Sequence, residues 1–447
     1  MTNFKFICDW LVAGRDAAEY RQTMAFLQLH VGNVNLMRNE DIWSKTIREP
    51  VLASAYPLAL WLASSWWRLN WEPLPAHGVR PSGDWRMAHE LGAANHGFVW
   101  PQIIFASDRE VMQVWAVPLN DNDNQSVRYL NGLEIPAAIT LTDFQSGVEE
   151  FIIAVLYRLS AMGSQNTELL NLWQLIQEER DEPENEKYRR VEAEMGYDPD
   201  ECPEELMHKA LELDQRMGTA ALSELAPVYG KSATQTPLTA IEEIVNSPGL
   251  VGMPCAPRSA CGAAAPHSAP WQRAVAAAGA LRQTLVNHHD KIDNAILCEL
   301  LGLDATDFEQ WSPVKRNDAA IAVPESGNHY KFIPRKTHPI AKRFELARFL
   351  GDYLLIEQIN GHWLASTDLN TSRQKFQRAF AAEFLCPIAI LRELLQGDYS
   401  ESAIEDAAYH FQVSQRTVES LLVNNGLTPS TPLVDYSEDR LPYQLGI

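Results

Sequence analysis

Residues 246–270 constrain the fold most, because they divide the chain. The stretch NSPGLVGMPCAPRSACGAAAPHSAP is dense in Pro, Gly, Ala and Ser, a composition typical of linkers and extended surface segments. At 447 residues, the chain is long enough for two or three domains. We therefore expect a linker over 246–270, with folded regions on both sides of it.

The N-terminal side is expected to contain two regions. Residues 1–145 form a mixed module, in which two apolar runs around SDRE in 99–119 predict a β-hairpin. Residues 146–245 are helical in pattern, with apolar residues three and four positions apart, and Asp143 is a candidate cap for the first helix. Several tryptophans are expected to lie mostly in the core of this side of the chain: Trp61, Trp66, Trp67, Trp71, Trp85, Trp100 and Trp115.

The C-terminal region, residues 271–447, is again periodic. Helices are predicted over 270–286 and 292–303, and a strand, a turn and a second strand over 319–335. The expected fold class is therefore α+β in a multi-domain chain. It combines a mixed N-terminal module, a helical segment, and a mostly helical C-terminal domain with a small sheet.

Charge and hydropathy exclude several classes of protein. The formal net charge is −21, which argues against a general nucleic-acid binder, because binding to the phosphate backbone depends on Lys and Arg. The N-terminal residues show no basic segment followed by a long apolar one, and no apolar run is long enough to span a bilayer. We expect a cytoplasmic protein that does not associate with membranes.

Three segments of the C-terminal region carry a family resemblance. They are KRFELARFLGDYLL (342–355), AFAAEFLCP (379–387) and AAYHFQVSQRTVESLLVNNGL (407–427). In their order and spacing they resemble the ImmA/IrrE family of small bacterial zinc peptidases. The resemblance covers residues 271–427, a little over a third of the chain, and implies a zincin-like fold there. The first segment alone also fits an ordinary amphipathic core helix, with these residues facing inward: Phe344, Ala347, Leu350 and Leu354.

The residues that the family uses for catalysis are missing from this sequence. A zincin helix places two His four positions apart to bind Zn²⁺, with a Glu beside the first as general base. The matching positions here hold Arg348, Phe349 and Asp352. The segment SRQKFQR (372–378) lacks the carboxylate that the family's next helix supplies. Arginine offers no lone pair, Phe cannot accept a proton, and one Asp does not make a tetrahedral site.

We therefore expect no catalytic residue, no metal and no cofactor in this domain, and we do not expect an active metallopeptidase. Arg348 and Asp352 lie one helical turn apart, where they could form a pair. Our hypothesis is that the guanidinium replaces the positive charge of the metal. The resemblance then implies a pseudo-peptidase that binds a protein or peptide partner without cleaving it, in bacterial stress response or phage defence.

Two alternatives belong to other functional classes. The chain could be an enzyme with its site around His89, Glu90 and His96. The second His comes seven positions after the first, however, which would place the two about 10 Å apart on a helix. It could also be a transcription regulator that uses a helix-turn-helix over 401–427. The acidic residues of that segment oppose binding to phosphates, so a nucleic-acid partner is not favoured.

Overall fold

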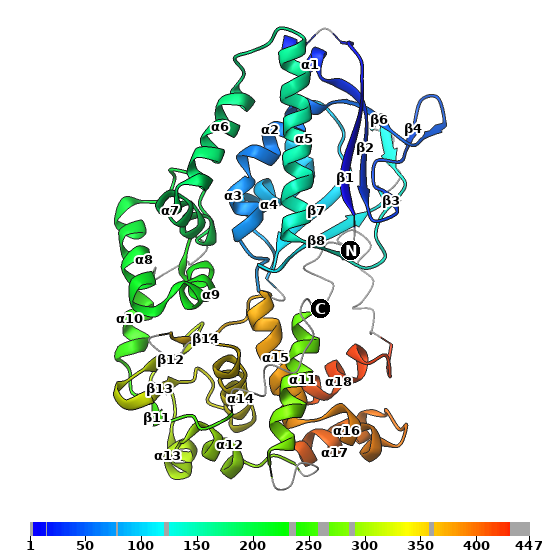
Figure 1. Cartoon of the computed structure of the whole chain (residues 1–447). Helices are drawn as coiled ribbons and strands as arrows, with labels where there is room; N and C mark the ends of the chain where they lie inside the picture. The colour runs from blue at the N-terminus through cyan, green and yellow to red at the C-terminus, as the bar shows by residue number, and fades with distance from the viewer. Residues whose placement is uncertain are drawn as a thin grey trace. The chain divides into compact units, whose positions relative to one another are not determined.

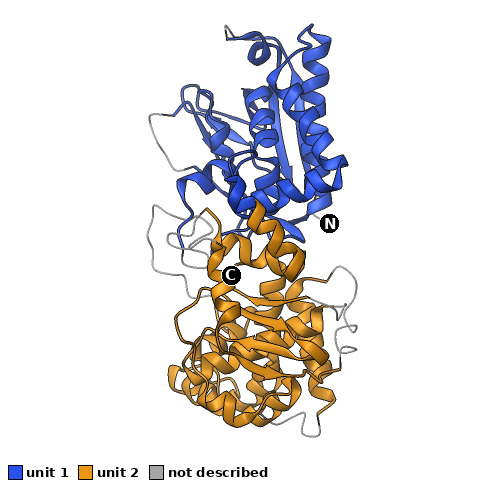
Figure 2. Cartoon of the chain, turned by 90° about the vertical axis from the view of Figure 1, so that its left-hand side faces the viewer, with its two compact units in different colours: residues 1–207, 435–447 blue, residues 208–434 orange. Residues whose placement is uncertain are grey.

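The computed structural model describes residues 3–14, 16–76, 79–119, 125–231, 238–257, 268–285, 291–356 and 362–429 (Figure 1). Within these ranges the fold is α+β, with several small antiparallel sheets, as the sequence predicts. The described residues divide into two compact units, those up to Met207 and those from His208 to residue 429 (Figure 2). The division falls inside helix α8 (Glu204–Met217).

The described part of the first unit contains three small antiparallel sheets. One has the order β1-β2-β3, with β6 also paired to β2; the others have the orders β10-β8-β7 and β5-β4-β9. The strands are β1 (Phe4–Trp10), β2 (Met24–Val31), β3 (Val34–Asn35), β4 (Asn39–Asp41), β5 (Thr46–Arg48), β6 (Val51–Ser54), β7 (Gln102–Ser107), β8 (Val111–Val117), β9 (Val127–Tyr129) and β10 (Ala137–Thr140). The hairpin predicted in 99–119 is confirmed as β7 and β8.

Helices pack against two of these sheets (Figure 1). In chain order, the helices of the first unit are α1 (Ala18–Gln22), α2 (Ala55–Ser64), α3 (Trp66–Trp71), α4 (Gly83–His89), the 3-10 helix η1 (Leu91–Ala94), α5 (Leu141–Ala161), α6 (Glu168–Asp181) and α7 (Pro183–Glu194). Helix α5 packs against β1, and α3 packs against β7. The cap of α5 is Thr140, whose side chain accepts from the N–H of Asp143. Asp143 therefore lies inside the first turn, and its predicted capping role is wrong.

The core of the first unit joins the mixed module to the helices that follow it. Phe144, Val148 and Phe151 of α5 pack in the same cluster as Phe4 of β1. The contact is so close that a Cβ at Gly147 would lie 2.7 Å from the Phe4 ring. The unit therefore continues well past residue 145, where we expected the mixed module to end. Periodicity identifies a helix, but it does not indicate which sheet the helix packs against.

Most of the tryptophans that we expected in this core are buried, as predicted. Six of the seven are less than a tenth exposed: Trp61, Trp66, Trp67, Trp85, Trp100 and Trp115.

The second unit has one described antiparallel sheet, with the order β11-β13-β12-β14. Its strands are β11 (Leu250–Gly252), β12 (Ala320–Pro324), β13 (Tyr330–Ile333) and β14 (Leu364–Ser366). The strand, turn and strand predicted over 319–335 are confirmed as β12 and β13. Strand β11 lies inside the segment that we expected to be a linker. The backbone of residues 250–252 pairs with β13, so this part of the segment belongs to the sheet and the linker prediction is wrong there. Residues 258–267 of that segment lie outside the described ranges.

The helices of the second unit include those that carry the family resemblance. They are α9 (Thr219–Tyr229), α10 (Thr239–Asn246), α11 (Pro270–Gln283), α12 (Asn294–Leu301), α13 (Ala305–Gln310), the 3-10 helix η3 (Ser326–Asn328), α14 (Pro339–Leu355), α15 (Ser372–Leu385), α16 (Ile388–Leu395), α17 (Glu401–Phe411) and α18 (Gln415–Asn424). Both predicted helices upstream of α14 are confirmed, as α11 and α12. Helix α15 packs against both α14 and α11 (Figure 1).

Candidate functional site

Helix α14 carries Arg348, Phe349 and Asp352, the three residues that the sequence resemblance would align with metal and base positions. Pro339 is its first residue, where a missing N–H costs nothing. Gly351 lets the helix approach α15 closely, since a Cβ there would lie 2.7 Å from the Phe380 ring. The helix is buried on most of its circumference, polar residues included. These polar side chains therefore need partners inside the protein.

Asp352 is held by an arginine from the neighbouring helix. It is fully buried, and its two carboxylate oxygens lie 2.7 Å from Nε and Nη2 of Arg373. One of these oxygens also accepts from the backbone N–H of Ala365. Burial alone would lower the pKa of Arg373, but the charge of Asp352 and its hydrogen bonds outweigh burial and raise this pKa. The pair is therefore a bidentate ion pair between α14 and α15.

Arg348 has different partners from those that we expected. Its Nη2 donates to the carbonyl oxygen of Thr367 at 2.6 Å and to Oε1 of Gln374 at 2.5 Å. Burial, followed by the charges of Arg378 and Arg335, lowers the pKa of Arg348 to about 9. The pair between Arg348 and Asp352 that their spacing allows is therefore not formed. The cation that neutralises Asp352 is Arg373 of α15. From this facing helix, two guanidinium nitrogens reach both oxygens of the carboxylate.

The same side chains close the outer edge of the sheet. Strand β14 pairs with β12 on one side, and it is the last strand in the described sheet. On its other side, Ala365 donates its N–H to Asp352 and accepts from the amides of Gln374 and Gln377, each at 2.9 Å. An edge strand normally leaves these backbone groups open to pairing. Here α14 and α15 satisfy them with side chains.

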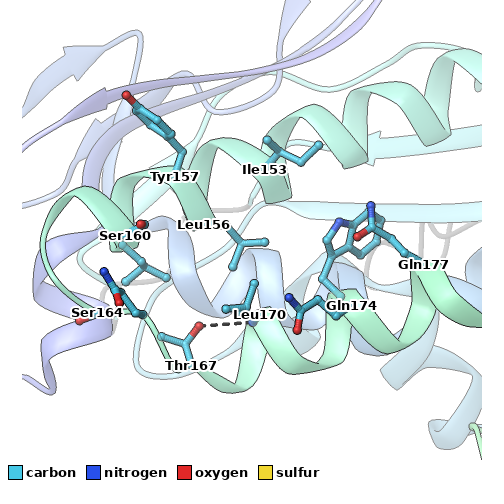
Figure 3. Close-up of a pocket in the computed structure, with 12 residues that line it drawn as sticks. Ile153, Leu156, Tyr157, Ser160, Ser164, Thr167, Leu170, Gln174 and Gln177 are labelled. Carbon is cyan, nitrogen blue, oxygen red and sulfur yellow. Dashed lines mark hydrogen bonds between the residues drawn. The ribbon is translucent and has the colours of Figure 1, made fainter.

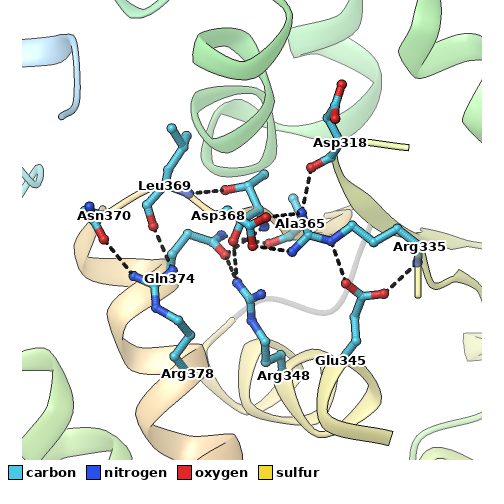
Figure 4. Close-up of polar contacts among 11 residues, drawn as sticks. Asp318, Arg335, Glu345, Arg348, Ala365, Asp368, Leu369, Asn370, Gln374 and Arg378 are labelled. Carbon is cyan, nitrogen blue, oxygen red and sulfur yellow. Dashed lines mark hydrogen bonds and ion pairs between the residues drawn. The ribbon is translucent and has the colours of Figure 1, made fainter. Parts of the chain in front are cut away.

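A second ion-pair group lies beside this edge (Figure 4). Arg335 binds Glu345 through Nε at 2.7 Å and Asp368 through both terminal nitrogens, at 2.6 and 3.0 Å. Arg378 donates to the carbonyl oxygen of Leu369 in the loop between β14 and α15. Burial lowers the pKa of Arg378 to about 10. Two arginines and two carboxylates therefore meet in this group, and Arg335 holds both carboxylates.

Phe349 is the residue that the sequence resemblance would align with a general base. Its side chain is fully buried, and its ring lies edge to face on Phe332 of the sheet, with centroids 5.6 Å apart. It contributes to packing and offers no proton acceptor. Within the described ranges, no three His, Cys, Asp or Glu side chains gather in a group that could hold a metal ion.

Sequence reasoning missed most of this network. It registered that SRQKFQR lacks a carboxylate, but the same segment supplies Arg373, Gln374 and Gln377, which hold Asp352, Arg348 and the edge of β14. The sequence feature that could have indicated this network is the three hydrogen-bonding side chains of that segment, together with Asp352 as the one acidic residue at the aligned positions of the preceding helix. Arg335 and Asp368 gave no signal, because the fold alone brings them together.

The candidate site in the first unit is built differently from a metal site. His89 of α4 is fully buried and its ring stacks on Trp85, with centroids 4.0 Å apart. One ring nitrogen lies 2.9 Å from the carbonyl oxygen of Phe105, and the other lies 3.0 Å from the carboxylate of Glu72. Both ring nitrogens are engaged, so neither is available to a metal ion.

Glu90 and His96 have partners of their own. Glu90 forms a two-point ion pair with Arg86, at 2.6 and 2.9 Å. The Nδ1 atom of His96 lies 3.2 Å from the hydroxyl oxygen of Tyr20. The three residues of this candidate site therefore contact three different sets of neighbours.

Residues 401–427 form the two helices expected of a helix-turn-helix. Helices α17 and α18 contact each other across a short turn, and Ser414 caps α18 by accepting from the N–H of Thr417. Gln415 and Arg416 at the start of α18 are exposed, as is Glu419 one turn later. Four acidic side chains oppose one Arg in this segment: Glu401, Glu405, Asp406 and Glu419. The shape fits a DNA reader, whereas the charge does not.

The described helices include none that is both long and apolar enough to cross a bilayer. Comparison with known proteins gives no match: no family model, no curated protein and no solved structure is significantly similar to the chain.

Proposed function

We propose that the chain is a regulatory or partner-binding protein whose second unit is a non-catalytic, metal-free relative of the ImmA/IrrE peptidases. One observation carries the proposal. The residues at the family's metal positions are committed to fixed structural contacts, Asp352 to Arg373 and Arg348 to Thr367 and Gln374. Of the roughly four acceptor sites of a carboxylate, three on Asp352 are taken, two by the bidentate guanidinium of Arg373 and one by the N–H of Ala365.

The chemistry of hydrolysis needs groups that this arrangement does not supply. Activating water at neutral pH takes a metal with an open coordination position and a proton acceptor beside it. Arg348 and Phe349 stand at positions that would have to provide a ligand and that acceptor. A unit built in this way can hold a protein or peptide partner but has no means of attacking its amide bonds. From the sequence resemblance we infer that this role belongs to bacterial stress response or phage defence.

The test asks whether the partner stays intact. The full chain, carrying an affinity tag, is recovered from bacterial cells before and after stress or phage infection, and a tagged acidic protein of similar size serves as the control. We expect a specific partner to be recovered at full length in mass spectrometry. Partner fragments that depend on the chain and disappear with a chelator would contradict the proposal. So would the absence of any specific partner in both conditions.

A further inference from the structure

A groove lies between helices α5 and α6 of the first unit (Figure 3). It encloses about 510 Å³. The α5 wall is formed by residues 153, 156, 157 and 160, and the α6 wall by residues 170, 173, 174 and 177. Both sets follow three- and four-residue spacing, so each helix presents one face over two turns, about 10 Å.

The groove is apolar at its floor and uncharged at its rim. Leu156, Leu170 and Trp173 provide the apolar surface, and the remaining lining includes Ser, Thr and Gln. Two apolar side chains at the wall are open to solvent, Ile153 at 52% and Tyr157 at 77%. None of the described lining residues carries a charge. Clustered apolar surface of this kind marks an interaction site more often than scattered exposed residues do.

The two walls are fixed at both ends. An ion pair joins Glu149 of α5 to Arg180 of α6 at 2.7 Å, one turn beyond the lining residues. At the other end, Ser164 in the connecting loop donates its hydroxyl to Gln22, and Thr167 caps α6. The groove is therefore preformed, which lowers the ordering cost of binding. Its length matches two turns of a helix.

The charge around the groove selects the partner. Glu150 of α5 and Glu168 and Glu178 of α6 are exposed, each within one turn of a lining residue. The two helices carry two cations, Arg158 and Arg180, and Arg180 is already paired with Glu149. An occupant with basic flanks gains from this field, and its association is accelerated by it. An anionic membrane surface would be repelled.

We propose that this groove binds the apolar face of a basic amphipathic helix from a partner protein. Apolar residues at positions i, i+3 or i+4, and i+7 of that helix contact Leu156, Leu170 and Trp173, and its basic residues face the acidic surroundings. This inference concerns the first unit and does not rest on the function proposed for the second.

The experiment uses the full chain and a synthetic probe. The probe is a short fluorescein-labelled peptide of Leu, Ala and Lys, with leucines at helical spacing; a second peptide of the same composition has the leucines rearranged to break that spacing. Binding is followed by fluorescence anisotropy at low and at raised salt. We expect saturable binding of the first peptide, at least roughly tenfold weaker binding of the second, and an affinity that falls as salt rises.

Matched variants locate the binding. Ile153→Asp and Tyr157→Asp alter exposed groove residues, whereas Leu175→Asp alters an α6 residue that is 46% exposed and outside the lining. We expect at least roughly tenfold weaker binding for the two groove variants and unchanged binding for Leu175→Asp. Thermal melts confirm that all three fold. Equal binding by Ile153→Asp and the native chain, or by both peptides, would overturn the proposal.

Sedimentation of the full chain tests whether a second copy of the chain occupies the groove instead. A monomer that binds the probe is the expected result. A dimer that Ile153→Asp dissociates would assign the groove to a second copy of this chain and would overturn the assignment to a partner protein.

Discussion

Asp352 and Arg348 are one helical turn apart on α14, yet only one of them has a partner of opposite charge among its hydrogen bonds. Asp352 is paired bidentately with Arg373, whereas Arg348 donates only to a carbonyl and an amide oxygen. A buried ion that keeps its partner is tolerated, but a buried ion that loses its partner is costly. The two arginines should therefore respond differently to the same substitution.

We expect Arg373→Met to lower the free energy of unfolding by about 3–5 kcal/mol, because it leaves the carboxylate of Asp352 buried without its partner. Arg348→Met is the matched control. It removes a cation that has no carboxylate in direct contact and leaves one carbonyl without a donor, which costs about 1–3 kcal/mol before the gain from removing a buried charge. Denaturant unfolding measures both variants. Equal losses would show that the Asp352–Arg373 pair has no special role.

Asp368 predicts a dependence on pH. Burial alone would raise the pKa of Asp368, but the charge and hydrogen bonds of Arg335 outweigh burial and hold this pKa below its usual 3.8. A depressed carboxyl pKa contributes stability above 3.8, and that contribution is lost as the pH falls through the folded-state pKa. We expect Asp368→Asn to be less stable than the native chain at pH 7. The difference should shrink as the pH falls below 3.8, and a difference independent of pH would contradict this account.

At the scale of elements, the contact between α14 and α15 depends on Gly351. A Cβ at this position would lie 2.7 Å from the ring of Phe380, which stacks on Phe384 in the same core. We expect Gly351→Ala to destabilise the protein by about 1–3 kcal/mol, despite the better helix propensity of Ala. The control is Gly279→Ala in α11, where, apart from the local segment of α11 itself, no atom lies within 4 Å of the added Cβ.

The control should stabilise the protein by up to about 1 kcal/mol in denaturant unfolding, because Ala costs less backbone entropy than Gly in a helix. If Gly351→Ala were stabilising as well, the two helices would not be in the close contact described for them.

Elements were easier to predict from the sequence than their partners. The β7–β8 hairpin, the β12–β13 pair and helix α11 all follow from local periodicity and turn residues. Strand β11 was missed, because three residues in a stretch rich in Pro and Gly carry no alternating pattern, and only pairing with β13 makes them a strand. The closing of the β14 edge was missed for the same reason, since its donors come from a different segment of the chain.

At the scale of the molecule, the helix-turn-helix of the second unit has the shape of a DNA-binding motif but not the positive charge that DNA binding needs. Helices α17 and α18 have the right connection, but acidic residues dominate their segment. In gel-shift assays at low salt we expect no shift of duplex DNA by the full chain. A shift whose affinity falls steeply with rising salt would show phosphate contacts and would contradict this expectation.

The most direct measurement of the central claim is the metal content of the purified full chain. Elemental analysis should give far less than one zinc per chain, because Asp352 is held by Arg373 and Arg348 cannot be a ligand. The matched variant Asp352→Asn should give the same low value. One zinc per chain in the native protein, lost in Asp352→Asn, would show that this carboxylate binds a metal ion and would contradict the account.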